Sequence, residues 1–496
     1  MEPESWVARE GPEGFGESEL PGFEDRFRLS DLGNLARLAR RRVVRTARFQ
    51  DRPSFAGILL AHLQTDLDEL EVVEESWPAY DLVNVQVGLD AWLAKAGVDH
   101  KVVGMRGHRH LDFGLSDLLH PPEPGEYGPL PGNVARVRLP LGADGALTSA
   151  VLAGVYLVTI EGLAGTHGVV RAALMVRAAD PESGVGLVQV HVVADQTAAA
   201  TQIGAELRVL AVEHNVFRGQ VLSFAHDLFG ERASALQFHR RPQVAESEVI
   251  LPAETMAAIR RQVVAVACHR DRLLAAGQHL KRGLLLYGPP GVGKTHAVRY
   301  LIGQLTDVTV VELSGDSLGA IGEACSVART LQPAMIVVED VDLIAEERGS
   351  YAGGSSLLFQ LLDEMDGLAE DTDVVFLLTT NRAEVLEPAL AARPGRVDQA
   401  IAIERPDPAA RRRLFALYRG DLDIDESNLD AVIERTEGVT ASFLKELLRR
   451  SALLAAEDDR AGQRLSVSAA QLDQALDELQ ETRNAMTRTL LGGSGS

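Results

Sequence analysis

The chain has 496 residues, 46% of them hydrophobic and 24% charged, as in ordinary globular proteins, and this length suggests about three domains. A formal net charge of −22 argues against a nucleic-acid partner, because proteins that bind nucleic acids usually carry a basic surface. The two cysteines, Cys268 and Cys325, have neither metal-ligand nor CxxC spacing, so no disulfide framework is indicated and a reducing cytoplasm suits the chain.

The sequence gives no indication of export or membrane insertion. Its first residues, Met1–Ser5, lack the basic-then-apolar order of a signal peptide. The longest uncharged run, residues 145–160, is shorter than the roughly 20 apolar residues that a membrane helix needs. We therefore expect a cytoplasmic protein with no membrane span.

The first 134 residues divide into two parts by composition. Residues 1–30 are rich in Glu, Gly and Pro and predict a flexible acidic arm. An arginine-rich run follows at 36–48, which a solvent-exposed helix face explains more simply than a membrane- or partner-binding helix. Apolar residues at helical spacing over 54–96 then predict a helical N-terminal region spanning 31–134.

The hydrophobic period changes from helical to alternating after a loop rich in Pro and Gly at 119–134. Strands are predicted at 151–160, 172–177 and 187–193, a helix at 196–212, and short strands at 217–224 and 233–238. Residues 135–245 thus read as an α+β module. It holds no recognisable catalytic constellation, which favours a structural or partner-binding domain.

A glycine-rich loop between a predicted strand, 283–287, and a predicted helix is the clearest chemical signal. A loop of this kind aims backbone N–H groups inward, and the helix adds its positive dipole end, so together they cradle phosphates. Lys294 would add a mobile charge for the β- and γ-phosphates, and the Thr295 hydroxyl can ligate Mg²⁺. The sequence therefore predicts an ATP and Mg²⁺ site at Gly288, Pro289, Pro290, Gly291, Val292, Gly293, Lys294 and Thr295.

Polar residues follow two later strands of the same region. The predicted strand 335–338 ends in Glu339 and Asp340, and the predicted strand 374–378 is followed by Asn381. Carboxylates at the carboxyl edge of a parallel sheet can hold Mg²⁺ and orient an attacking water. Asn381 is placed to hydrogen-bond the γ-phosphate or that water.

Residues ~250–480 resemble an AAA-family (AAA+) ATPase module, close to the proteasomal, membrane-protease and membrane-remodelling branch. The motifs that carry the resemblance are GPPGVGKT, the run LLFQLLDEMDGL at 357–368, TTNR at 379–382 and RPGRVD at 393–398. The resemblance implies an α/β P-loop sheet at 246–404, a helical lid at 405–485 and assembly into a ring, usually a hexamer. It also implies that Arg393 and Arg396 reach the nucleotide of the neighbouring subunit.

The chain departs from the family pattern at two functional positions. The usual Asp-Glu pair is reversed, an order that some branches share, so by position Glu339 takes the Mg²⁺ role and Asp340 polarises water. The pore loop, normally aromatic-aliphatic-glycine, reads Ala320-Ile321-Gly322. If the ring threads a polypeptide, Ile321 and Tyr351 are the side chains expected to contact it.

Two functions remain open from the sequence. In the first, ATP turnover in a ring remodels or disassembles a protein substrate recruited by residues 1–245. In the second, the ring is a nucleotide-switched assembly or regulatory factor of a larger machine, for example a contractile injection apparatus, without threading. No HExxH occurs, so no protease domain is expected, and residues 492–496 resemble an artificial linker.

Overall fold

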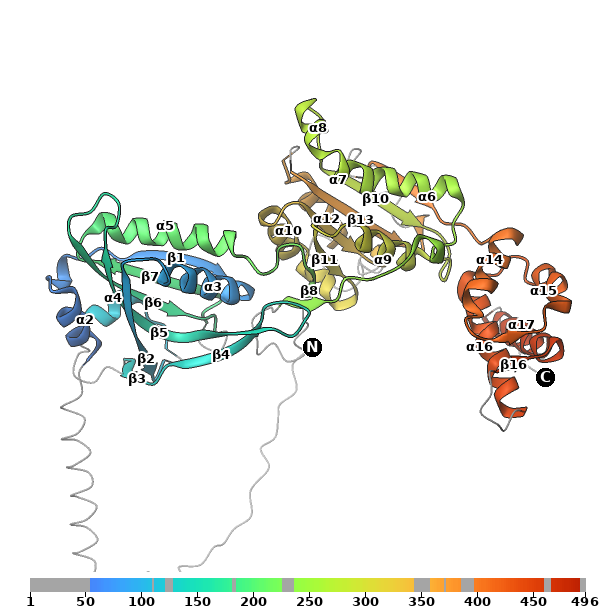
Figure 1. The fold of residues 1–496 in the computed structure, drawn as a ribbon, viewed down its shortest axis with the longest axis horizontal. Coiled ribbons are helices and arrows are strands. Elements are labelled where there is room, and N and C mark those ends of the chain that lie inside the picture. The colour runs from blue at the N-terminus through green and yellow to red at the C-terminus, as the bar shows by residue number, and fades with distance from the viewer. Residues whose placement is uncertain are drawn as a thin grey trace, which may run out of the picture. The chain divides into compact units, whose positions relative to one another are not determined.

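The structure is a computed structural model of the chain (Figure 1). It describes residues 54–108, 111–120, 128–180, 184–224, 236–342, 357–369, 372–384, 397–458 and 465–490. None of the helices in these ranges is long and apolar enough to cross a membrane.

The first domain is an antiparallel sheet with helices on both faces (Figure 1). Its strands are β1 (Val73–Pro78), β2 (Val98–Arg106), β3 (Leu130–Gly132), β4 (Ala135–Pro140), β5 (Leu147–Glu161), β6 (Val169–Arg177) and β7 (Leu187–Ala194). Helices α3 (Leu82–Leu93) and α5 (Thr197–Glu213) share a buried cluster with one face, and α2 (Phe55–Leu63) and α4 (Leu115–Leu119) with the other.

The predicted boundary between a helical region, 31–134, and an α+β module, 135–245, is wrong. Strand β2 pairs with β5 along seven residue pairs from Val98↔Ile160 to Gly104↔Gly154, so both sides of residue 134 contribute to one sheet. Strand β1 was missed because it buries only the side chain of Trp77 and so shows no apolar run. Its partner β7 lies more than a hundred residues later, and such pairings leave no local sequence pattern.

The second sheet is largely parallel and has the order β14-β10-β13-β12-β11-β8-β9. Its strands are β8 (Val221–Phe224), β9 (Leu236–His239), β10 (Arg282–Tyr287), β11 (Thr309–Leu313), β12 (Ala334–Val338), β13 (Val374–Thr380) and β14 (Gln399–Ala402). Every residue of β12 and β13 is buried, as expected for parallel strands covered on both faces.

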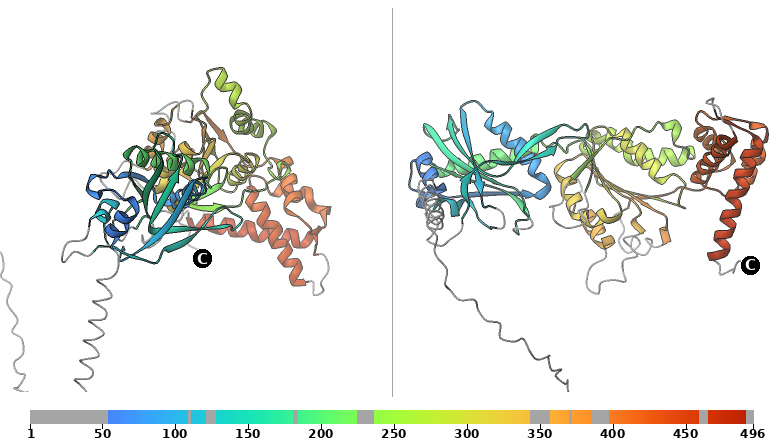
Figure 2. Two further views of the ribbon diagram at one scale, coloured as in Figure 1. Left: turned by 60° about the vertical axis from the view of Figure 1, so that its left-hand side comes forward. Right: turned by 90° about the horizontal axis from the view of Figure 1, so that it is seen from below.

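Helices cover both faces of this sheet, as the views in Figure 2 show. Helices α6 (Ala253–Arg260) and α9 (Lys294–Gln304) pack on one face, and α10 (Ile321–Thr330) and α12 (Leu357–Asp366) on the other. After α6 the chain forms a π-helical turn, Arg261–Ala265, and continues as α7 (Val266–Cys268) and α8 (Arg270–Ala275).

Strands β8 and β9 correct the predicted boundary at residue 245. The sequence assigned them to the first module, but β8 pairs in parallel with β11, and β9 pairs antiparallel with β8. The second sheet therefore begins at Val221, well before the predicted start of the ATPase region. We call these two strands the β8–β9 ribbon.

The third part is the helical lid. It consists of α14 (Pro408–Tyr418), α15 (Leu429–Arg435), α16 (Ala441–Asp458) and α17 (Ala469–Leu490), with a short parallel pair β15 (Asp423–Ile424) and β16 (Ser466–Val467). All four helices begin within the predicted lid region, 405–485, and α17 ends a few residues beyond it. Their shared core includes Phe415, Val432, Leu447 and Leu476, each buried.

Candidate functional site

The glycine-rich loop joins β10 to the first residue of α9, at the carboxyl edge of the second sheet. Gly288 has φ +149°, and a Cβ there would lie 2.1 Å from the carbonyl oxygen of Ile403. Gly293, the N-cap of α9, has φ +108°. Both conformations are in the region that favours glycine, so the turn requires glycine at these two positions.

Lys294 opens α9 and points back into the loop. Its side chain is buried, and Nζ donates to the carbonyl oxygens of Gly288 at 2.8 Å and Pro289 at 3.1 Å. A third bond joins Nζ to Oδ1 of Asn381 at 2.7 Å. Burial lowers the pKa of Lys294, while the nearby Asp340 and Asp342 act in the opposite direction.

Asn381 connects Lys294 to the first of the carboxylates. Its Nδ2 donates to Oδ1 of Asp340 at 2.9 Å, so Lys294, Asn381 and Asp340 form a continuous hydrogen-bonded array. Asp340 has φ +51°, an uncommon conformation for a residue other than glycine. Backbone strain of this kind costs about 1–3 kcal/mol and is concentrated at functional sites.

Glu339, the residue before Asp340, lies next to the start of α9. Its backbone N–H donates to the carbonyl of Leu313 at 3.0 Å, and its side chain shares a hydrogen bond with Thr295. Burial raises the pKa of Glu339, and the negative charge of Asp340 adds to that rise. The structure therefore brings together Thr295 and Glu339, the two residues predicted to hold Mg²⁺.

Asp342 and the two threonines before Asn381 support this arrangement, a role that was not predicted from the sequence. Asp342 is buried, and its Oδ1 accepts from Thr380 Oγ1 at 2.8 Å and from the backbone N–H of Asn381 at 3.3 Å. Thr379 Oγ1 accepts from the N–H of Asp340 at 3.1 Å. The sequence does contain a signal for the threonines, because the two of them end a strand that is otherwise entirely apolar.

The lid touches the phosphate loop at the start of α16. The N–H of Ser442 donates to the carbonyl of Gly291 at 3.1 Å, and the Ser442 hydroxyl approaches the same oxygen at 3.3 Å. Lys445, one turn further on, is exposed and lies 6.0 Å from the ring centre of Tyr418. At this position Lys445 is an exposed lysine on the surface of the lid.

The remaining predicted residues divide between a correction and positions outside the described residues. Ile321 is fully buried at the start of α10, in the core beneath the sheet, so it cannot contact a threaded polypeptide as predicted. An isoleucine at a helix start gives no sequence signal of whether it faces the core or a pore. Arg393, Arg396 and Tyr351 lie outside the described residues.

The residues present fit ATP and Mg²⁺. The loop has the backbone conformation of an anion cradle, and Lys294 lies within it with three oxygen partners that phosphate oxygens can replace. Mg²⁺ is usually held by one or two protein oxygens together with phosphates and water, which Thr295 and Glu339 can supply. Within the described ranges, no group of three or more His, Cys, Asp or Glu side chains forms a separate metal site.

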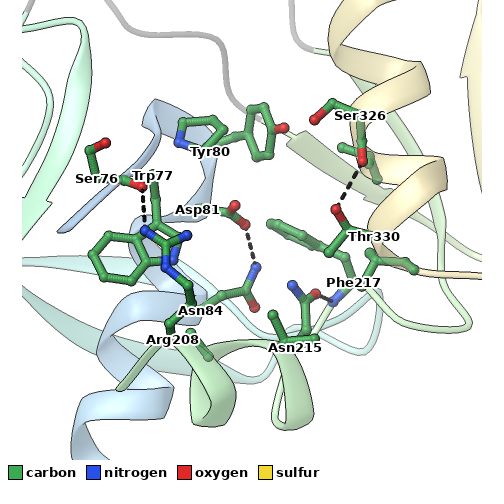
Figure 3. Close-up of a pocket in the computed structure, with 15 residues that line it drawn as sticks. Ser76, Trp77, Tyr80, Asp81, Asn84, Arg208, Asn215, Phe217, Ser326 and Thr330 are labelled. Atoms are coloured by element: carbon green, nitrogen blue, oxygen red, sulfur yellow. Dashed lines mark hydrogen bonds between the residues drawn. The ribbon is translucent and has the colours of Figure 1, made fainter. Parts of the chain in front are cut away.

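Apart from the ATP site, a cavity of about 160 Å³ is lined by residues of the first domain and of α10 (Figure 3). Asn84 donates to Asp81 at 2.8 Å on its wall, and its own Oδ1 accepts from the N–H of Val216 at 2.9 Å. Tyr80 packs edge-on against Phe224 of β8, with ring centres 6.0 Å apart. These contacts tie the first domain to the segment that leads into the β8–β9 ribbon.

Comparison with known proteins places this site in a recognised family. Residues 284–405 match the model of the ATPase family associated with various cellular activities (AAA). The chain is 34% identical over 215 residues to the ATP-dependent zinc metalloprotease FtsH of Thermus thermophilus, which covers 40% of this chain and 34% of the relative. It is 37% identical over 202 residues to FtsH 2 of Sphaerobacter thermophilus, covering 38% of this chain and 31% of the relative.

A third relative, FtsH of Mycobacterium tuberculosis, is 34% identical over 204 residues, which are 38% of this chain and 27% of that protein. The chain thus spans about a third of the length of the curated relatives it matches. The family match covers the strands from β10 to β14 and the hydrogen-bonded array at their carboxyl edge, and it supports ATP hydrolysis as the chemistry of this region. Residues 284–405 are an AAA ATPase domain.

Proposed function

We propose that the chain hydrolyses ATP as a homo-oligomeric ring, a hexamer, and uses the turnover to remodel or disassemble a protein substrate recruited by residues 1–245. The observation that carries the proposal is the array Lys294–Asn381–Asp340 beside the Thr295–Glu339 pair. Binding groups and groups that can activate water are held together there, at one edge of one sheet. AAA proteins generally assemble as hexameric rings, which supports the oligomeric part of the proposal.

Each side chain has a distinct task in this proposal. Bound Mg²⁺–ATP supplies the phosphoryl group that is transferred to water. Lys294 and the loop N–H groups bind the phosphates, and Thr295 with Glu339 would hold the metal. Asn381 orients the Asp340 carboxylate through Oδ1, so that Asp340 can orient a water and accept its proton. Arg393 and Arg396 would stabilise the developing charge from the neighbouring subunit.

The relatives' names describe ATP-dependent metalloproteases, and the HExxH pattern is not found in this sequence. We propose protein remodelling as the use of ATP turnover by the part of the chain described here. An acidic first half is compatible with a protein partner and argues against DNA translocation.

A nucleotide-switched assembly or regulatory factor is the second candidate. The burial of Ile321 favours it, because the position where this family usually places a pore side chain instead fills the core. The two candidates differ in one measurable property. A remodelling enzyme should unfold or extract a bound partner only while ATP is hydrolysed, whereas a switch should release its partner on nucleotide exchange alone. Partners captured by an Asp340→Asn protein loaded with ATP provide the substrates for that comparison.

Mixing two inactive variants tests the shared-site ring. Lys294→Ala removes the phosphate-binding cation, and Arg396→Ala removes the proposed trans donor; each alone should abolish most hydrolysis. Mixed rings should regain activity at interfaces that pair an intact loop with an intact arginine. Loss of the arginine is expected to cost about 10³–10⁵ in rate, as for related arginines. If mixed rings form but regain no activity, the arginines act within their own subunit and the shared-site proposal fails.

A further inference from the structure

The cavity of about 160 Å³ beside α10 has a wall of both aromatic and polar side chains (Figure 3). Three rings, those of Trp77, Tyr80 and Phe217, supply much of its apolar surface. Trp77 and Phe217 are buried, and the rings of Tyr80 and Phe217 lie at 59° to each other with centres 6.4 Å apart. Ligand sites commonly combine apolar walls of this kind with a few polar groups that fix the orientation of the ligand.

The carboxylate of Asp81 lies on this wall without a cation beside it. Asp81 is the residue before α3, but its side chain caps none of the N–H groups of that helix. Its Oδ1 accepts from Nδ2 of Asn84 at 2.8 Å, and within the described part of the chain no basic side chain pairs with it. Burial raises the pKa of Asp81, and the hydrogen bond from Asn84 opposes that rise. Burying a carboxylate without a counter-ion is costly, and a cationic ligand would remove that cost.

The guanidinium of Arg208 lies on the same wall, but it already has a counter-ion. Its Nε donates to Oε2 of Glu75 at 2.7 Å, and its Nη2 donates to the same oxygen. The guanidinium carbon lies 4.9 Å from the centre of the Trp77 ring. Asp81 therefore carries the one uncompensated charge among the residues that line the cavity, and Arg208 shows that the wall accommodates a guanidinium over an aromatic ring.

The wall formed by α10 reaches the surface of the protein. Ser326 and Thr330 line the cavity from this helix, and both are exposed. Tyr80 faces the same space, and burial, followed by the charge of Asp81, raises its pKa to about 12, so its hydroxyl stays protonated. A long side chain can thus enter from the surface and meet a carboxylate, a hydroxyl and aromatic rings.

We propose that this cavity binds an arginine side chain of the protein substrate, with the guanidinium at Asp81 and against the rings of Tyr80 and Phe217. The inference rests on the proposed function, in which residues 1–245 recruit that substrate, and it names the chemistry that they recognise. Arginine is favoured over lysine because its guanidinium is planar, stacks on aromatic rings and is the more weakly hydrated of the two cations. Since the walls belong to the first domain and to α10, the bound side chain would contact both the recruiting region and the ATPase domain.

Calorimetric titration of the full chain with a defined peptide, in the absence of nucleotide, provides the test. The probe is a nonapeptide of glycine and serine with one central arginine. The matched control peptide carries citrulline, the neutral isostere of arginine, at the same place. The arginine peptide should bind, and the citrulline peptide should bind about ten- to a hundredfold more weakly, the effect expected for a hydrogen bond to a charged group.

Variants on both walls locate the binding site. Asp81→Asn keeps an acceptor for Asn84 but removes the charge, so it should weaken binding of the arginine peptide about ten- to a hundredfold without destabilising the free protein. Glu161→Gln, an equal charge change at an exposed position at the end of β5, should leave binding unchanged. Ser326→Leu fills the cavity from an exposed position of α10 and should also abolish binding, which tests the proposal if Asp81→Asn fails to fold.

The outcomes separate the inference from the function on which it rests. If the two peptides bind alike, or if Asp81→Asn binds the arginine peptide as the parent does, the cavity does not recognise a guanidinium. If ethylguanidinium binds and the arginine peptide does not, the cavity takes a small free cation and the proposed protein ligand is wrong. If the parent binds the arginine peptide but hydrolyses no ATP, the proposed function is wrong and the ligand class of the cavity stands.

Discussion

Both large sheets of this chain contain buried polar side chains, but these side chains have different roles in the two sheets. In the first domain, Arg177 is buried and donates to the backbone carbonyls of Leu111 and Phe113, the latter at 2.7 Å, and lies over the Phe113 ring. Gln86, also buried, accepts from the N–H of Val151 at 2.9 Å. These groups fasten one segment of the fold to another.

At the proposed ATP site, polar side chains bond to one another and to the carbonyl groups of the phosphate loop. Lys294 bonds to Asn381, Asn381 bonds to Asp340, and Asp340 holds an uncommon backbone conformation. Such an arrangement retains free energy that ligand binding can release. Burial of polar groups alone thus does not identify a functional site. Structural and functional polar groups are distinguished by their hydrogen-bond partners.

The largest expected effect is at Lys294. Lys294→Met should raise the dissociation constant for ATP about a thousandfold or more, on the order of 4 kcal/mol, because a charge-assisted phosphate contact is lost. The nucleotide-free variant should be as stable as the parent or more stable, since a buried ammonium is replaced by an apolar chain of similar length. Calorimetric titration and urea unfolding measure the two effects; Lys445→Met, at an exposed lysine, is the control.

The pH dependence of the free energy of unfolding provides a sharper test of the prediction for Lys294. Because burial holds the pKa of Lys294 below its ordinary value, the unfolded state binds the proton more tightly. Parent stability should therefore rise as the pH increases through the window between the lowered and the ordinary lysine pKa. The Lys294→Met protein should lack that rise. An identical pH profile of stability for both proteins would show that burying the ammonium does not lower the free energy of unfolding.

Ile321 is next in expected magnitude. Ile321→Ala should lower the free energy of unfolding by about 2–4 kcal/mol, as for other large-to-small changes in a packed core. Leu453→Ala, at a side chain 51% exposed on α16, should change it little. If Ile321→Ala kept its stability and lost only substrate processing, the residue would belong to a pore after all.

The smallest expected effect is at Arg177, the counterpart of Lys294 in the first domain. Arg177→Met leaves the carbonyls of Leu111 and Phe113 without their donor and should cost about 1–3 kcal/mol of stability. ATP affinity and turnover should be unchanged. A variant that kept full stability but lost ATP affinity would contradict the division between the two sheets.

The residues of the proposed ATP site could be chosen from the sequence because the pattern that points to them is local. Glycines, lysine and threonine are adjacent in the chain, and the strands before Glu339 and Asn381 are continuous apolar runs. The sequence could not show that Asn381 bridges Lys294 and Asp340, because that contact depends on three strands meeting at one edge. Nor could it show that Ile321 faces inward.

The predicted domain boundaries were wrong because the strand pairings that define the domains are not local in the sequence. Strand β1 is amphipathic and short, and the β8–β9 ribbon joins a sheet whose next strand follows forty residues later. Pairing between distant strands is decided by packing, which a single sequence does not display. The same ribbon places Ser223 beside Glu312 of β11, so the error in the boundary also hid that pairing.

The most direct test of the central claim separates binding from turnover at Asp340. The Asp340→Asn side chain can still hydrogen-bond Asn381 but cannot accept a proton, so ATP affinity should stay within a few-fold of the parent. Hydrolysis should fall by about 10²–10⁴, the usual contribution of a general base. Both are measured on one preparation, by titration with ATP and by phosphate release. Retained binding with lost turnover is the result predicted here; equal loss of both would make Asp340 a metal ligand, and unchanged turnover would contradict the assignment of this array as the catalytic site.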